Sequence, residues 1–162
     1  MSLLLLSGLA MATEVGKTEL FGIGASTGWP GAISVTGKYY FNQKFGLAAF
    51  LGTSVVVSGL QAQVEGEFYE IHDWNWARFP LFWFAGLDLG ITNYHNGKVG
   101  DDIYPHLGVY GGVGAALQFH SVPAEVFVEA GIALYPLNGC SSFAYGLCLA
   151  NGVGRAGGRW YF

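Results

Sequence analysis

Apolar and more polar residues alternate along much of this chain with a period of two. In one clear stretch, Ile33 and Val35 alternate with Ser34, Thr36 and Lys38. The same alternation runs through positions 62–69, 81–90 and 125–132. Because successive side chains of a β-strand point to opposite faces, this period predicts strands with one apolar and one more polar face.

A helical alternative rests on two uncharged runs, 45–64 and 130–154, each long enough for a membrane-spanning helix. Glycine, serine, asparagine or proline interrupts both runs, and glycine disfavours helices. A helix would also place Glu65 and Glu67 about 200° apart, with one of them towards lipid. A strand places both carboxylates on one face, so the pattern favours strands.

Turn residues divide the chain into eight predicted strands. The turn signals are Trp29-Pro30-Gly31, Asn42-Gln43-Lys44, Asn96-Gly97 and Ser121-Val122-Pro123. The predicted strands cover 18–27, 32–41, 45–54, 60–71, 79–91, 104–119, 124–134 and 149–162. An even number of antiparallel strands brings both chain ends to one side, as in bacterial barrels. We therefore predict an all-β fold, an eight-stranded antiparallel up-and-down transmembrane β-barrel.

The predicted connections suggest which side of the membrane each end faces. Those after the second and sixth strands are short and the one at 72–78 is intermediate; those after the third, fifth and seventh are mostly longer, whereas the one after the first is short. Outer-membrane barrels have short periplasmic turns and longer external loops. This places both chain ends in the periplasm.

Composition agrees with a surface that faces lipid. The chain of 162 residues is 52% hydrophobic, 16% aromatic and only 11% charged, and it has 26 glycines. A soluble domain of this size needs more surface charge. The net charge of −4, without a basic stripe, gives no reason to expect a nucleic-acid partner.

The first residues predict export. An apolar run from position 3 to 9 precedes Ala10-Met11-Ala12, which fits a small-residue cleavage site. We expect residues 1–12 to be a signal peptide, although it has no Lys or Arg, and residues 13–162 to form the barrel domain. In an oxidising compartment, Cys140 and Cys148 are expected to form a disulfide in the connection after the seventh strand, because no other metal ligands lie nearby. No metal or cofactor is expected.

Two segments resemble a known family. The final stretch, 152–162, resembles the terminal strand of outer-membrane proteins, and 39–47 resembles a strand–turn–strand of small barrels of the OmpA transmembrane-domain and OmpX kind. The resemblance implies that Phe162, with Trp160 two positions before it, is an assembly signal for the barrel-assembly machinery. It also implies a bacterial outer-membrane location, with membrane lipid and lipopolysaccharide as partners. A surface partner is not identified.

Inward-facing charges are the most informative candidate residues. By alternation we expect a polar network in the lumen made of Lys38, Glu65, Glu67, Asp88, Glu129, Arg155 and Arg159. Side chains fill the interior of an eight-stranded barrel, and buried charges must be paired. We therefore favour a plug over a gated pore, and we expect Glu129 to contact Arg155 or Arg159.

Other residue groups carry weaker functional hypotheses. His120 and Ser121 near Glu125 could form a hydrolase site, but a proline-containing turn explains them better. A carbohydrate or partner platform at 72–76 competes with an interfacial aromatic belt.

Two further groups are weaker still. A cation site at His95, Asp101 and Asp102 competes with a solvated turn. The glycines at 22–24 and 111–114 lack the helix that a phosphate loop needs.

The sequence as a whole favours a non-enzymatic barrel with a filled lumen, which acts in membrane anchoring or integrity or through its loops. A lipid-modifying enzyme and a narrow passive pore are the alternatives.

Overall fold

The computed structural model describes residues 15–18, 20–29, 32–54, 57–95, 98–135 and 150–162, and its regular elements are strands. There are eight: β1 (Phe21–Trp29), β2 (Ile33–Asn42), β3 (Phe45–Thr53), β4 (Val57–Asp73), β5 (Ala77–His95), β6 (Lys98–Phe119), β7 (Ala124–Leu134) and β8 (Ala150–Tyr161). The described residues contain no helix that is long and apolar enough to cross a membrane.

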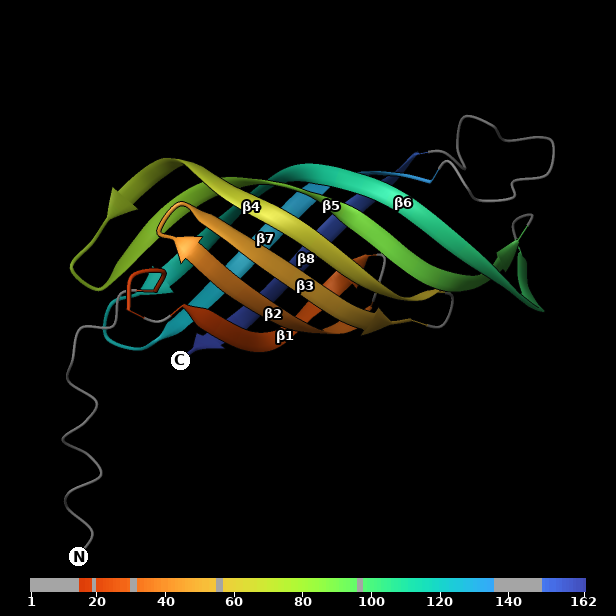
Figure 1. The fold of residues 1–162 in the computed structure, drawn as a ribbon, viewed down its shortest axis with the longest axis horizontal. Coiled ribbons are helices and arrows are strands. Elements are labelled where there is room, and N and C mark those ends of the chain that lie inside the picture. Colours follow the sequence, from red (N-terminus) through yellow and green to blue (C-terminus); the bar gives the residue numbers. More distant parts are fainter. Residues whose placement is uncertain (1–14, 19, 30–31, 55–56, 96–97, 136–149) are drawn as a thin grey trace, which may run out of the picture.

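The strands form a closed antiparallel barrel in chain order, with β8 hydrogen-bonded to β1. The predicted all-β, eight-stranded up-and-down fold is therefore confirmed. Figure 1 shows the strands running obliquely around the barrel, with the start of β1 and the end of β8 on the same side. We call this side the terminal end and the opposite side the far end.

Strand alternation separates the residues of the barrel into two sets. In β2, Ser34, Thr36 and Lys38 are buried in the lumen, while Ile33 and Val35 are exposed on the outer face. The same division holds in β3 and β7. The outer surface is consequently apolar, and the polar side chains of the strands meet inside.

Glycines allow the seam between β1 and β8 to close. A Cβ atom on Gly24 would lie 1.9 Å from the carbonyl oxygen of Gly158. Gly28 has a φ of 142°, which L side chains rarely adopt, and a Cβ there would lie 2.0 Å from the oxygen of Gly154. Only glycine fits at these two positions, so the close pairing of β1 with β8 depends on them.

Several predicted boundaries were wrong, because strands β4, β5 and β6 are longer than the alternation indicated. β4 begins at Val57 and the turn after it covers only 74–76, so the predicted connections after the third and fourth strands are shorter. Residues 92–95 and 98–103, predicted as a loop, belong to β5 and β6, and Tyr94 and His95 pair with Val99 and Lys98. The β4–β5 hairpin extends beyond the barrel at the terminal end and the β5–β6 hairpin at the far end (Figure 1). Length differences between connections thus separate the two ends less clearly than the sequence suggested.

Candidate functional site

The centre of the lumen holds six charged side chains, which we call the lumen network. Each is at most 5% exposed. Three are cations and three are carboxylates: Lys38, Arg155, Arg159, Glu65, Glu125 and Glu129. The formal charges therefore cancel, as they must where water is excluded.

Two ion pairs follow directly from the register of β7 and β8. Glu129 is opposite Arg155, and Glu125 is opposite Arg159. The Nε atom of Arg155 donates to Glu129 Oε2 at 2.8 Å, and its Nη2 atom lies 2.7 Å from the same oxygen. Arg159 Nη1 donates to Glu125 Oε1 at 2.8 Å. Of the two partners considered for Glu129, Arg155 is the one in contact.

The opposite wall of the barrel completes the network. Lys38 Nζ lies 2.6 Å from Glu65 Oε2 and 3.6 Å from Glu125 Oε2. Gln63 joins the two halves, since its Nε2 atom donates to Glu65 Oε1 and to Glu129 Oε1, each at 2.9 Å. Hydrogen bonds therefore connect β2, β4, β7 and β8 across the lumen.

Aromatic rings separate the two arginines. The guanidinium carbon of Arg155 lies 3.8 Å from the ring centroid of Phe50, and that of Arg159 lies 4.0 Å from that of Phe127. Gly157, between the arginines on β8, leaves room for the Phe127 ring, because a Cβ atom there would lie 2.7 Å from Phe127 Cζ. Such cation–π contacts stabilise charge where solvent is excluded.

Little space remains beside the network. One cavity next to Arg155 and Asp88 and another next to Lys38 and Glu65 each have a volume of about 10 Å³. That is about the space of a single water molecule. The arrangement can hold the strands together and obstruct the lumen, and these two cavities are too small for a substrate.

Asp88 lies in the lumen but in a separate cluster. Its Oδ2 atom accepts a hydrogen bond from Tyr135 Oη at 2.7 Å and lies 3.7 Å from His106 Nε2. Gln61 lies between this cluster and the network, because it accepts a hydrogen bond from Arg155 and shares a small cavity with Asp88.

Glu67 points to the interior side but lies past the last pair of β3 and β4, which is Phe45 and Gly66. It contacts Arg78 from β5, whose Nη2 atom is 2.6 Å from Glu67 Oε2 and 2.8 Å from Glu70 Oε2. Glu67 therefore belongs to the terminal mouth of the barrel, not to the lumen network.

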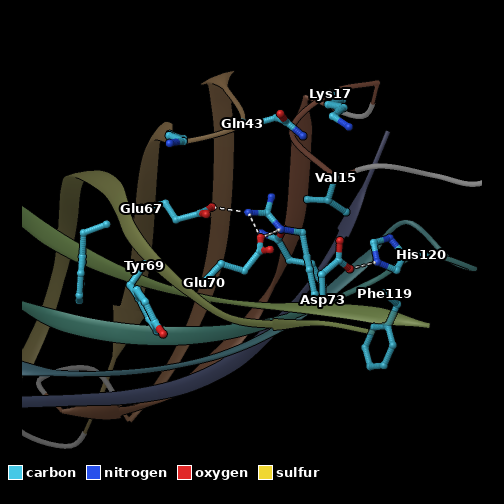
Figure 2. Close-up of a pocket in the computed structure, with 13 residues that line it drawn as sticks. Val15, Lys17, Gln43, Glu67, Tyr69, Glu70, Asp73, Phe119 and His120 are labelled. Atoms are coloured by element: carbon cyan, nitrogen blue, oxygen red, sulfur yellow. Dashed lines mark hydrogen bonds and ion pairs between the residues drawn. The ribbon is translucent and has the colours of Figure 1, made fainter. Parts of the chain in front are cut away.

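A larger cavity opens at this mouth, and we call it the mouth cavity. Its volume is about 510 Å³. The protruding β4–β5 hairpin forms one side, and the segment before β1 and the β2–β3 turn form another (Figure 2). The lining residues are Val15, Lys17, Gln43, Lys44, Glu67, Phe68, Tyr69, Glu70, Asp73, Arg78, Gln118, Phe119 and His120.

The residues of the hydrolase hypothesis do not converge. His120 Nε2 lies 2.8 Å from Asp73 Oδ1, whereas Glu125 is buried against Arg159 and Lys38. Instead, His120 joins the β6–β7 turn to the β4–β5 hairpin, since its backbone nitrogen also donates to Trp76 O.

The aromatic segment at 72–76 forms the tip of the β4–β5 hairpin. The rings of His72 and Trp74 have centroids 4.8 Å apart, and those of Trp74 and Trp76 stack at 5.7 Å. The ring of Trp76 also packs against that of Phe119, with centroids 6.1 Å apart. These rings continue the exposed aromatic surface of the barrel beyond its terminal end.

Several network residues were missed from the sequence although alternation could have found them. Glu125 is four positions before Glu129 on the same strand face, and Gln61 and Gln63 share the face of Glu65. Tyr40 lies on the same strand face as Lys38, and its hydroxyl donates a hydrogen bond to Glu125 Oε2 at 3.0 Å. The alternation was applied to charged residues alone, so Gln61, Gln63 and Tyr40 were omitted, whereas Glu125 was weighed only with His120 and Ser121.

The remaining candidates lie elsewhere. Trp160 and Phe162 are exposed at the terminal end of β8, 45% and 68% respectively. Cys140 and Cys148 lie outside the described residues, as does the predicted signal peptide. The side chains of His95, Asp101 and Asp102 are also outside the described part of the chain. The glycines at 22–24 and 111–114 lie within β1 and β6.

Comparisons with known proteins found no matching family model, no matching curated protein and no matching solved structure. The functional argument therefore rests on the geometry of this barrel.

Proposed function

We propose that this protein is a bacterial outer-membrane barrel of the small kind to which the OmpA transmembrane domain and OmpX belong, and that it acts without catalysis. The barrel anchors the chain and contributes to membrane integrity, and the segments beyond its ends contact partners. One observation carries the proposal: a closed barrel has an apolar outer face around a filled lumen whose central network is charge-balanced.

The outer face supports a lipid environment. Ile33 on β2 is 71% exposed and Leu51 on the neighbouring β3 is 65% exposed, while Ile132, 61% exposed, lies on β7, which is adjacent to neither strand. An apolar surface that surrounds a molecule would promote aggregation in water. In a bilayer the same surface contacts acyl chains, and the closed barrel satisfies its backbone hydrogen bonds internally. Membrane lipid and lipopolysaccharide are the proposed partners of this face.

Aromatic residues on the outer face gather towards the terminal end. Phe21 pairs with Tyr39, which contacts Phe41 edge to face at 5.7 Å, and Phe45 and Trp160 lie near the same end. Aromatic girdles mark the membrane–water interfaces of barrels. With both chain ends in the periplasm, this belt would lie at the periplasmic interface.

The last strand supports recognition by the barrel-assembly machinery. Phe162 N donates to Phe21 O at 2.8 Å, while its side chain remains exposed on the face that Trp160 shares. Both aromatic side chains lie exposed on the outer side of the closing strand. We therefore assign Trp160 and Phe162 to assembly.

Expression in a Gram-negative host tests the proposal. The full chain should enter the outer-membrane fraction, with a β circular dichroism spectrum after extraction and different gel mobility before and after boiling. Deletion of Phe162 should reduce insertion in cells more than refolding in detergent, whereas Phe45→Ala, on the same face but away from the terminus, should insert normally. Lipid A masses should stay unchanged in cells that make the protein.

A soluble, correctly folded product or a helical spectrum would contradict the membrane assignment. Equal cellular insertion of the chain without Phe162 would contradict the assembly role. A new lipid A species that depends on the protein would favour the lipid-modifying enzyme.

A further inference from the structure

The cluster around Asp88, on the far-end side of the lumen network, contains a buried histidine. His106 on β6 is 5% exposed, and Asp88 on β5 is 1% exposed. Gly90 is the strand partner of His106, and Gly108 is that of Asp88. A Cβ atom on Gly90 would lie 2.8 Å from His106 Cε1, and one on Gly108 would lie 2.5 Å from Tyr135 Cδ1. The two glycines therefore leave room for both rings beside the Asp88 carboxylate.

Asp88 adds a negative charge that the lumen network does not balance, because the network already holds three cations and three carboxylates. Among the described side chains, His106 is the basic group that lies within ion-pair distance of Asp88, with its Nε2 atom 3.7 Å from Asp88 Oδ2. A buried carboxylate without a cation is costly, so this place favours one more positive charge. A proton on His106 would supply it.

The ring of His106 is placed to receive this proton. Its Nε2 atom is buried and has no hydrogen-bond partner among the described residues. The oxygen that it faces, Asp88 Oδ2, is held by Tyr135 Oη, which donates to it at 2.7 Å. The rings of His106 and Tyr135 meet edge to face, with centroids 5.4 Å apart. In a protonated imidazole both nitrogens are donors, and a movement of about 1 Å would bring Nε2 to hydrogen-bond distance of Asp88.

The other groups around this pair do not provide the missing charge. Gln61 on β4 is neutral, and Arg155 on β8 is engaged with Gln61 and Glu129. Tyr110 on β6 lies beneath the Arg155 guanidinium, 5.4 Å from its carbon to the ring centroid. Between about pH 5 and 8, carboxylates and arginine are ordinarily charged and tyrosine is neutral, whereas histidine changes its charge. His106 is therefore the pH-responsive group among the described members of this cluster.

We propose that His106 and Asp88 form a pH-sensitive latch towards the far end of the barrel. At mildly acidic pH, His106 takes a proton from the aqueous phase and pairs with Asp88, which ties β6 to β5 beside Tyr135. When the proton leaves, Asp88 is buried against a neutral ring, and the β5–β6 hairpin opens more often. The latch is additional to the anchoring role and does not depend on which side of the membrane the far end faces.

Hydrogen exchange of the full chain, refolded in detergent, tests the latch at about pH 5.5 and 7.5. Protection factors correct for the effect of pH on chemical exchange. For the amides of 88–92 and 104–108 they should be about ten-fold larger at the lower pH, which is within the limit of about ten-fold per pH unit for release of one proton. Equal protection at both pH values in the wild type would overturn the proposal.

Variants separate the latch from other effects of pH. His106→Gln cannot take up the proton and Asp88→Asn has no charge to pair with it, so each should abolish the ten-fold difference. His120→Gln, at the terminal end, is the matched control and should retain it. A pH dependence that survives in either latch variant would overturn the proposal.

NMR titration of the wild-type protein needs no variant. The ring signals of His106 should move between about pH 5 and 8, together with those of Tyr135, because the two rings are in contact. Ring signals of His106 that stay constant over this range would overturn the proposal. A loss of protection at the lower pH that depends on His106 would do the same, since it would show that the buried ring excludes the proton.

Discussion

The lumen network and the mouth cavity both contain arginine–carboxylate pairs, but in different surroundings. In the network, Arg159 is 3% exposed and contacts Glu125 and the ring of Phe127. At the mouth, Arg78 also pairs with two carboxylates, but the side chain of Glu70 is 36% exposed. Burial therefore decides whether arginine–carboxylate pairs form a fixed plug or an adaptable rim.

The difference arises from strand pairing. In the centre every strand has two neighbours, so side chains from all sides converge and exclude water. Beyond Gly66, β4 has lost its partner β3 and pairs only with β5. The hairpin that carries Glu70 and Asp73 consequently stands in solvent on one side, where ion pairs are weak and screened by salt.

Loss of a network arginine should produce the largest effect. Arg159→Met leaves Glu125 buried without its closest cation, and should lower the free energy of unfolding by about 3–5 kcal/mol. The matched change at the mouth, Arg78→Met, should cost less, because Arg78, Glu67 and Glu70 are 15%, 13% and 36% exposed and keep part of their hydration. Urea unfolding of both variants in the same detergent, followed by gel mobility, measures the difference.

A double variant sharpens this comparison. Arg159→Met combined with Glu125→Leu removes both charges and should recover much of the stability lost in Arg159→Met, because an apolar pair tolerates burial. If the double variant is less stable than either single variant, hydrogen bonds from Tyr40 and Gln118 to Glu125 contribute more than charge balance does.

Substitutions at two glycines of β8 compare the effect of added volume inside the barrel with its effect on the outer face. In Gly157→Ala the new Cβ would lie 2.6 Å from the oxygen of Ala25 and 2.7 Å from Phe127, so we expect a loss of about 1–3 kcal/mol. In Gly154→Ala the new Cβ meets no atom within 4 Å, and stability should change by less than about 1 kcal/mol. Thermal unfolding of the two variants compares them, and equal losses would mean that the Phe127 ring does not need the space above Gly157.

Much of the barrel follows from the sequence because the alternation is local. The faces of Lys38, Glu65 and Glu129 are fixed by their neighbours along each strand, and opposite positions on β7 and β8 then bring Glu129 to Arg155. The same rule places Glu125 on the face of Glu129 in the predicted strand 124–134, although Glu125 was weighed only as part of a hydrolase site.

The mouth cavity could not be predicted in the same way. Register shifts between Glu67 and Tyr69, and again between Glu70 and His72, interrupt the period of two in β4. The segment before β1 folds across the mouth, where Val15 packs against Tyr40 and Tyr161. Such a contact between distant parts of the chain leaves no periodic signal.

The smallest effect is expected at the contact between His120 and Asp73. His120→Gln should change global stability by less than about 1 kcal/mol, because both side chains are partly exposed. Amide exchange in the β4–β5 hairpin should become faster, while exchange in β7 and β8 should not change. Faster exchange throughout the barrel would show that the hairpin and the lumen network unfold together.

Planar-bilayer recording of the wild-type protein tests most directly whether the lumen network closes the barrel. Three cations and three carboxylates pair across the lumen, and the cavities beside them hold about 10 Å³ each. We therefore predict negligible conductance for the wild type over the full range of applied voltage. Large, stable single-channel currents from the wild type would contradict the plug and make a passive pore the better account of this protein.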